Sequence, residues 1–169
     1  GLGRGAGGFR GGGLGADAGG TGSGGGRAAN RGRSEFVEVA GVYISYPFCA
    51  QKCTYCNFAS GVFPRALEVR YLDVLLGQLR ATEWEWTPET VYLGGGTPSQ
   101  LAGDSLSSIL AAIPGREWTE ATIEAAPGGL SAEKIAAWRE AGINRVSLGV
   151  QSFVQKELAR TGRRHTAEI

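Results

Sequence analysis

The chain has 169 residues, of which 20% are charged and 42% hydrophobic, and its formal net charge is +1 at pH 7. This length suffices for one ordinary domain with a buried core. The near-neutral charge gives no reason to expect a nucleic-acid-binding fold. No stretch is long and apolar enough for a membrane span or for the core of a signal peptide, so we expect a cytoplasmic protein.

Residues 1–33 differ in composition from the rest of the chain. They hold 16 of the 29 glycines, and five arginines against one aspartate. Glycine loses the most backbone freedom on ordering and this segment has almost no apolar side chains to bury, so we expect a disordered tail. RNA binding is the alternative, because Arg-Gly segments also bind single strands. Residues 34–169 carry 12 Lys and Arg against 15 Asp and Glu, and we expect them to form the folded domain.

After the tail, strand patterns alternate with helix patterns. Runs rich in β-branched and aromatic residues predict strands at 42–46, 90–96, 119–127 and 145–153. Apolar residues three to four positions apart predict helices over 66–84 and around 106–113, the second ended by Pro114. Ser131 suits the N-cap of a third helix, which Gly142 ends, and a fourth helix-like segment covers 154–160.

This alternation predicts an α/β fold with a parallel sheet, either open or closed into a barrel. In both architectures the chemistry lies at the carboxyl ends of the strands. The informative residues all fall there: the cysteines follow the first strand, glycines 94–96 end the second, Glu124 ends the third and Gln151 ends the fourth. The four strand ends therefore predict one site.

The three cysteines of the chain fall within the eight residues "CAQKCTYC", at positions 49, 53 and 56. An odd number without a secretory signal argues against a disulfide framework. A structural zinc site needs four ligands, and the fourth is missing unless the distant His165 supplies it. A [4Fe–4S] cluster takes one thiolate per iron, so three cysteines leave one iron open to another ligand. From the cysteines alone, the cluster and zinc both remain candidates.

The segment "YISYPFCAQKCTYCNF" resembles the cluster-binding loop of radical S-adenosylmethionine (SAM) enzymes, and its surroundings resemble the oxygen-independent coproporphyrinogen III oxidase family. Three further segments match that family in order: "YLGGGTPSQL", "IEAAPGGLSAEKIAAWREAGINRVSLGVQSF" and "ELARTGRRHT". The resemblance covers about residues 42–166. True oxidases carry an extra cysteine two residues after the third ligand, where this chain has Phe58; that pattern is similar to the haem-chaperone branch, often called HemW. The family's usual histidine before the loop is Ser45 here, so no role of that histidine is carried over.

The resemblance implies that Cys49, Cys53 and Cys56 hold a [4Fe–4S] cluster whose open iron is chelated by SAM. It assigns the remaining contacts as follows: Gly95, Gly96 and Thr97 to the amino-acid end of SAM, Glu124 to its ribose hydroxyls or amino group, and Gln151, Arg163, Tyr43 and Tyr55 to a second SAM molecule or the substrate-side pocket. An ion pair with Arg145 is the alternative reading of Glu124. We expect His165 to be a surface residue at a helix end.

The resemblance also implies a partial radical SAM (βα) barrel, with about the first four of six βα units, as the N-terminal fragment of a longer protein. We expect an open, apolar edge at the fourth strand, and an isolated chain that is marginally stable and inactive. The implied partners are haem or a porphyrin, an electron donor such as flavodoxin or ferredoxin, and a haem-accepting protein, including membrane-associated haemoproteins. A porphyrinogen-decarboxylating oxidase and a zinc-stabilised binding module are the alternative functions.

Overall fold

The structure, a computed structural model, describes residues 40–166 and residue 168. The tail predicted for residues 1–33 lies outside the described residues. Four strands alternate with helices, as the sequence predicts. The strands are β1 (Gly41–Tyr46), β2 (Thr90–Gly95), β3 (Glu120–Ala125) and β4 (Arg145–Leu148). The helices are α1 (Arg65–Ala81), α2 (Gly103–Ala111), α3 (Ala132–Glu140) and α4 (Gln155–Arg160), with a short 3₁₀ helix, η1 (Pro98–Gln100), before α2.

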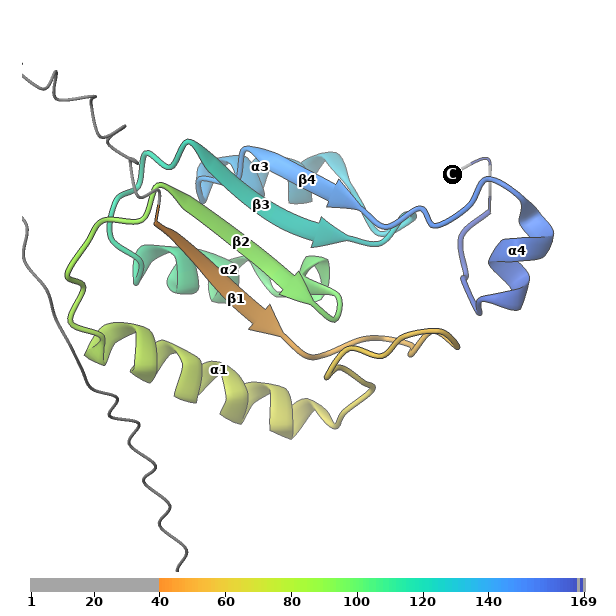
Figure 1. Cartoon of the computed structure of the whole chain (residues 1–169), viewed down its shortest axis with the longest axis horizontal. Helices are drawn as coiled ribbons and strands as arrows, with labels where there is room; N and C mark the ends of the chain where they lie inside the picture. Colours follow the sequence, from red (N-terminus) through yellow and green to blue (C-terminus); the bar gives the residue numbers. More distant parts are fainter. Residues whose placement is uncertain (1–39, 167, 169) are drawn as a thin grey trace, which may run out of the picture. The chain divides into compact units, whose positions relative to one another are not determined.

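The four strands form one parallel sheet in the order β1-β2-β3-β4. Because every pair is parallel, all four carboxyl ends lie at the same edge of the sheet, which Figure 1 shows as four arrowheads pointing the same way. The register sets Ser45 opposite Gly94, and Glu124 opposite Ser147. The residues near the carboxyl ends of the strands, Ser45, Glu124 and Ser147, therefore lie on the same face of the sheet.

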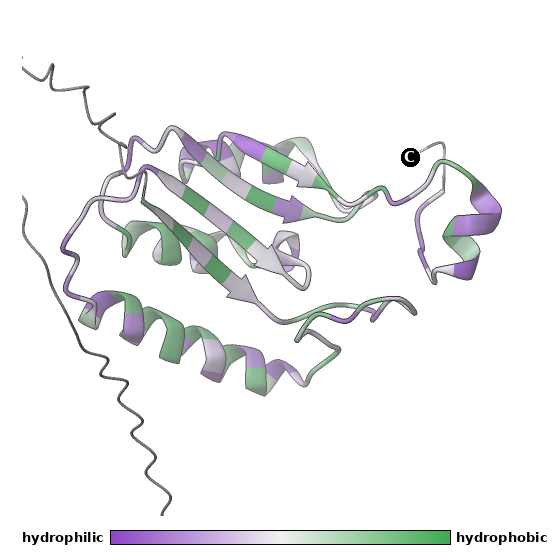
Figure 2. Ribbon diagram, in the orientation of Figure 1, coloured by the Kyte–Doolittle hydropathy of each residue, from purple (hydrophilic) through white to green (hydrophobic). Residues whose placement is uncertain are grey.

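Helices α1, α2 and α3 pack on one face of the sheet. Alternate strand residues are buried against them, among them Ile44 (4% exposed), Leu93 (0%) and Ile123 (0%). The helices contribute residues of the same apolar stripes that the sequence shows, including Leu79, Leu106, Ile109, Leu110 and Trp138. The alternation along the strands is visible as green and pale bands in Figure 2. Burial on this face explains the period-two pattern of the strands.

The opposite sheet face carries polar and aromatic residues, and no helix of the described residues packs over it (Figure 1). Its rows, read across the sheet, include Tyr43, Tyr92, Thr122 and Arg145, and then Ser45, Gly94, Glu124 and Ser147. Tyr43 is 59% exposed, whereas Thr122 is fully buried. Parallel sheets are usually covered on both faces, whereas among the described residues this face leaves the ring of Tyr43 accessible.

Most element boundaries agree with the sequence prediction within two residues, but α1 and β4 end earlier than predicted. Helix α1 ends at Ala81, and β4 ends at Leu148 where the sequence pattern suggested a strand to residue 153. After Gly149, which still donates to the Ala125 carbonyl oxygen (2.9 Å), the chain turns upon itself. Gln151 therefore lies beyond the strand, in the left-handed region at φ 69°.

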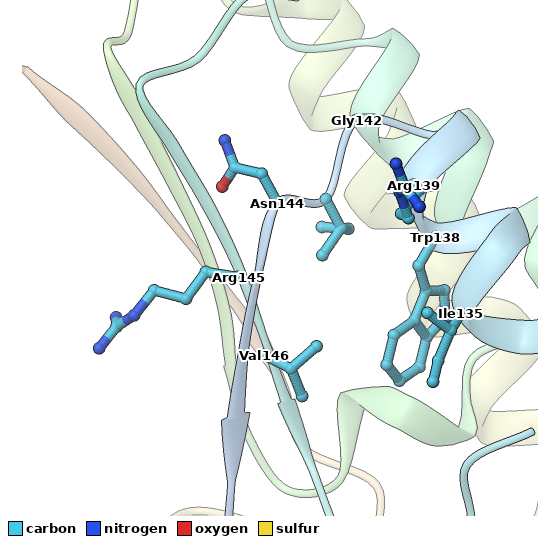
Figure 3. Close-up of a pocket in the computed structure, with 8 residues that line it drawn as sticks. Ile135, Trp138, Arg139, Gly142, Asn144, Arg145 and Val146 are labelled. Atoms are coloured by element: carbon cyan, nitrogen blue, oxygen red, sulfur yellow. The ribbon is translucent and has the colours of Figure 1, made fainter. Parts of the chain in front are cut away.

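The β4 edge is open and apolar among the described residues, as expected. Val146 is 41% exposed and Leu148 is 45% exposed. Beside them, α3 and β4 border a cavity of about 510 Å³, in which Trp138 and Ile135 lie on the helix side and Val146 on the strand side (Figure 3). Within the described part of the chain, no helix combines the length and the apolar character needed to cross a bilayer.

Substitution Ile109→Ala should destabilise the domain, because Ile109 is 0% exposed in the core. Deleting a side chain of this kind removes transfer free energy and leaves a cavity, so we expect a loss of about 2–5 kcal/mol in the free energy of unfolding, measured by urea denaturation. The matched control is Val74→Ala on the outer face of α1, where Val74 is 70% exposed; its effect should stay within about 0.5 kcal/mol. Equal losses of unfolding free energy in the two variants would show that Ile109 does not lie in the core.

Candidate functional site

A cavity of about 760 Å³ lies at the carboxyl edge of the sheet. Its walls come from the cysteine loop (residues 47–64, between β1 and α1), the end of β2, the turn after β3, and residues 147–151, which cover the end of β4 and the turn after it. Residues 162–165, which follow α4, close another side. The cavity beside α3 and β4 contains neither a cysteine nor a carboxylate among its lining residues. The reactive groups of the described chain are therefore gathered at the carboxyl edge.

All three cysteines line this cavity as free, half-buried thiols. No group of three or more His, Cys, Asp or Glu side chains within the described residues is packed tightly enough for a single metal ion. In a [4Fe–4S] cluster each thiolate binds a different iron, so its cysteines do not converge on one point. The donor set of three thiols on one loop, beside an open cavity, fits such a cluster.

The glycine triplet at the end of β2 holds the start of the cysteine loop. Gly96 N–H donates to the Tyr46 carbonyl oxygen (2.7 Å) and Thr97 N–H to that of Phe48 (2.9 Å). A Cβ atom on Gly96 would lie 2.5 Å from the Phe48 carbonyl oxygen and 3.0 Å from Cys49 Sγ. Gly95 sits at φ 109°, a conformation that L side chains rarely adopt. Both glycines are thus required by the local backbone, and both also line the cavity.

Glu124 reaches the cavity from β3 and is held by two donors. The Tyr92 hydroxyl donates to Oε1 at 2.8 Å, and Gly95 N–H donates to Oε2 at 3.1 Å. The alternative ion pair with Arg145 is wrong, because that guanidinium lies 3.0 Å from the carboxylate of Glu120. The register explains this, since Arg145 stands at the start of β4 and Glu124 near the end of β3.

Tyr92 is a site residue that the sequence analysis missed. Burial, followed by the hydrogen bond to Glu124, raises the pKa of Tyr92 above its ordinary value, so its hydroxyl stays protonated and keeps donating. Its ring stacks on Tyr43, with centroids 5.6 Å apart. Tyr43 itself is not among the residues that line the cavity. The structure therefore places Tyr43 one ring behind Glu124, with Tyr92 between them.

The cysteine loop is braced from outside by residues 155–166, which we call the C-terminal arm. Gln51 Nε2 donates to the Gly162 carbonyl oxygen at 2.6 Å, and Arg164 Nε donates to Gln51 Oε1 at 2.6 Å. Arg163 Nη2 donates to the Tyr55 hydroxyl at 2.6 Å. The sequence predicted Tyr55 and Arg163 as site residues but not Gln51. Both the amide nitrogen and the amide oxygen of Gln51 are hydrogen-bonded to the arm.

The remaining selected residues lie at or beside the same cavity. Thr97 and Gln151 line it, Gln151 from the turn after β4. Phe58 also lines it and is 70% exposed. The expectation that His165 lies on the surface is wrong: it is 7% exposed, with Nε2 3.0 Å from the Val150 carbonyl oxygen. The arm folds back over the turn after β4, and this contact buries the imidazole.

Residues 43–169 match the family model of the Radical SAM superfamily. The chain is 38% identical over 138 residues to the heme chaperone HemW of Escherichia coli K12, covering 73% of this chain and 35% of that protein. It is 38% identical over 128 residues to the heme chaperone HemW of Lactococcus lactis, covering 73% and 34% of the two chains. The chain thus spans about a third of the length of the curated relatives it matches.

A solved structure with a similar fold is the coproporphyrinogen III oxidase HemN from Escherichia coli, described as a radical SAM enzyme. The TM-score is 0.65 at 22% sequence identity, and the match covers 76% of this chain and 31% of that one. At this identity the likeness establishes the fold alone. The four parallel βα units of this chain therefore correspond to part of a radical SAM fold.

Substitution Tyr92→Phe tests how Glu124 is held. A hydrogen bond to an ionised group that is partly open to solvent contributes about 0.5–1.5 kcal/mol, so we expect a loss of that size in the free energy of unfolding. A double-mutant cycle with Glu124→Gln should give a coupling energy of similar size. Tyr43→Phe is the control, because the Tyr43 hydroxyl donates no hydrogen bond within the described residues. Additive effects of Tyr92→Phe and Glu124→Gln would show that the two side chains do not interact.

Proposed function

The chain belongs to the radical SAM superfamily, and from this premise we propose that it binds a [4Fe–4S] cluster and SAM and serves in haem binding and delivery, as a haem chaperone. The observation that carries the proposal is the grouping of the chain's only three cysteines on one loop at the wall of the large cavity, with Glu124 on the same cavity wall. Three thiolates leave one iron of a cubane without a protein ligand.

The cluster and SAM, when bound, supply a 5′-deoxyadenosyl radical by one-electron cleavage of the sulfonium carbon–sulfur bond. The residues of this chain would bind and orient. Cys49, Cys53 and Cys56 would ligate three irons. The backbone at Gly95 and Gly96, with the Thr97 hydroxyl, would approach the amino-acid end of SAM closely because no Cβ stands in the way.

Glu124 would accept hydrogen bonds from the ribose hydroxyls or the amino group of SAM. Tyr92 and Gly95 N–H hold one carboxylate oxygen each, and every carboxylate oxygen can accept more than one bond. The carboxylate is thus oriented before a ligand arrives, which lowers the ordering cost of binding. Gln151 and Arg163, which also line the cavity, would contact the substrate or a second SAM molecule, with Tyr55 beside Arg163.

Haem delivery is favoured over oxidation of a porphyrinogen by two observations. The extra cysteine of the true oxidases is replaced by Phe58, an exposed apolar side chain at the cavity. The relatives at 38% identity are described as heme chaperones. A haem-accepting protein and an electron donor such as a flavodoxin or ferredoxin complete the proposed set of partners. The oxidase remains the second candidate because the fold is shared with HemN.

Anaerobic reconstitution of the protein with iron and sulfide should give the visible absorption of a cubane cluster and, after reduction, an EPR signal that SAM alters. Each of Cys49→Ala, Cys53→Ala and Cys56→Ala should abolish both signals, because the chain has no other cysteine to replace the lost thiolate. Thr54→Ala, between two of the cysteines, is the matched control and should keep both. A protein that binds zinc without sulfide, or a cluster whose EPR signal ignores SAM, would contradict the proposal.

The haem chaperone and the oxidase are separated by two assays on the reconstituted protein. A chaperone should bind haem, followed by its absorption spectrum, and should release no carbon dioxide from a propionate-bearing porphyrinogen. Carbon dioxide release together with 5′-deoxyadenosine formation would establish the oxidase instead.

A further inference from the structure

The charge of the large cavity does not match the cofactors proposed for it. Four cationic side chains line the cavity, Lys52, Lys134, Arg163 and Arg164, against the single carboxylate of Glu124. Residues 34–169 as a whole carry more acidic than basic side chains. Positive charge is therefore concentrated at this cavity in a domain that is otherwise acidic.

The cofactors leave this excess positive charge in place. SAM has two cationic groups, the sulfonium and the ammonium, and one carboxylate, so it brings net positive charge. An oxidised cubane on three thiolates brings one negative charge, and the two contributions cancel. A cavity lined by unneutralised cations concentrates anions, because a low-dielectric wall focuses the field. A further ligand with several negative groups would balance it.

Arg164 is held in a way that suits such a ligand. Its Nε donates to Gln51 Oε1, and the same Gln51 amide is fixed by its bond to the Gly162 carbonyl oxygen. The two terminal nitrogens of Arg164 make no hydrogen bond within the described residues, and the side chain is exposed. A guanidinium anchored at Nε presents its other nitrogens as parallel donors, which matches a carboxylate.

Lys52 is a second exposed cation among the residues that line the cavity. It adjoins Gln51 in the cysteine loop, is exposed, and has no ion pair among residues 40–166, where the two ion pairs are Arg65–Glu68 and Arg145–Glu120. Lys134, by contrast, already donates to the carbonyl oxygens of Ser99 (3.0 Å) and Gly129 (3.1 Å). Arg163 donates from Nη2 to the Tyr55 hydroxyl, and its buried Nε has no partner among the described residues. The exposed cations with free donors are therefore Arg164 and Lys52.

We propose that Arg164, positioned by Gln51, and Lys52 form a carboxylate clamp at the mouth of the cysteine cavity, which binds a ligand carrying two or more carboxylates beside SAM. The inference rests on the proposed function for the identity of the neighbouring cofactors, and it names the groups of a tetrapyrrole that this chain would grip, its propionates. Gln51 is a positioning residue, since it acts through Arg164.

The test compares coproporphyrin, which has four carboxylates, with its tetramethyl ester, which has none, by fluorescence titration of the protein. The acid should bind more tightly than the ester, and the preference should shrink with added salt. Arg164→Gln should weaken binding of the acid about 10-fold, as expected for one lost charge-assisted pair, and leave the ester unchanged. Arg164→Lys should lie between them, because it keeps the charge but loses the paired donors.

Gln51→Leu distinguishes positioning from stability. It should lower the ratio of acid to ester affinity, which a purely structural role would not change, and thermal unfolding reports any loss of stability separately. Lys156→Gln, on α4 and away from the cavity lining, is the control and should preserve the ratio.

Several results would overturn the clamp: equal binding of acid and ester, no porphyrin binding by the unsubstituted protein, or an unchanged ratio in Arg164→Gln. Competition by inorganic phosphate as strong as by a dicarboxylate would show a general anion site and overturn the specificity for carboxylates. If the acid is preferred in the protein without metal but no cluster forms on reconstitution, the clamp stands and the proposed function fails. If the cluster forms and binds SAM but acid and ester bind alike, the proposed cofactors stand and the clamp fails.

Discussion

The close approach of the β2 glycines to the cysteine loop is the constraint on which the rest of the site depends. The Gly96 position has room for no side chain, because a Cβ there would collide with the carbonyl oxygens of Tyr46 and Phe48. The backbone bonds from Gly96 and Thr97 continue the pairing of β1 with β2 past the end of the strands. The loop that carries Cys49 is thereby fixed to the sheet. Gly95, the neighbour of Gly96, also orients Glu124 through its N–H.

The site is built from two kinds of support. Glu124 and the glycines stand on the sheet, whose parallel register brings their strand ends together. The cysteines stand on a loop, which Phe48 ties to the core through contacts with the rings of Tyr46 and Tyr71. The Tyr46 hydroxyl in turn donates to the buried Glu68 at 2.7 Å, an acceptor that also pairs with Arg65. The packing of Phe48 and this hydrogen bond lock the start of the loop, as a precise site on a loop requires.

The sequence sufficed for the order and type of the elements, because the apolar periods of two and of three to four residues are local. Ser131, for example, caps α3 as expected, accepting from Lys134 N–H at 3.2 Å. Features that depend on distant contacts were not predictable. Tyr92 meets Glu124 across 32 positions of sequence and Gln51 meets Arg164 across 113, and no local pattern marks either pair. The burial of His165 and the early end of β4 also depend on a distant contact, because the C-terminal arm packs on the turn after β4.

The brace formed by the C-terminal arm imposes an order on biosynthesis. Gln51 binds Gly162, which lies 111 residues further along the chain. At about 5–20 residues per second, synthesis of the intervening segment takes on the order of ten seconds. Until the ribosome has released that stretch, the loop has its inner anchor on β2 at best, and its three thiols lack their outer cover. During that interval the three thiols are less protected than in the folded domain, and the loop is closed on both sides only after Gly162 has left the ribosome.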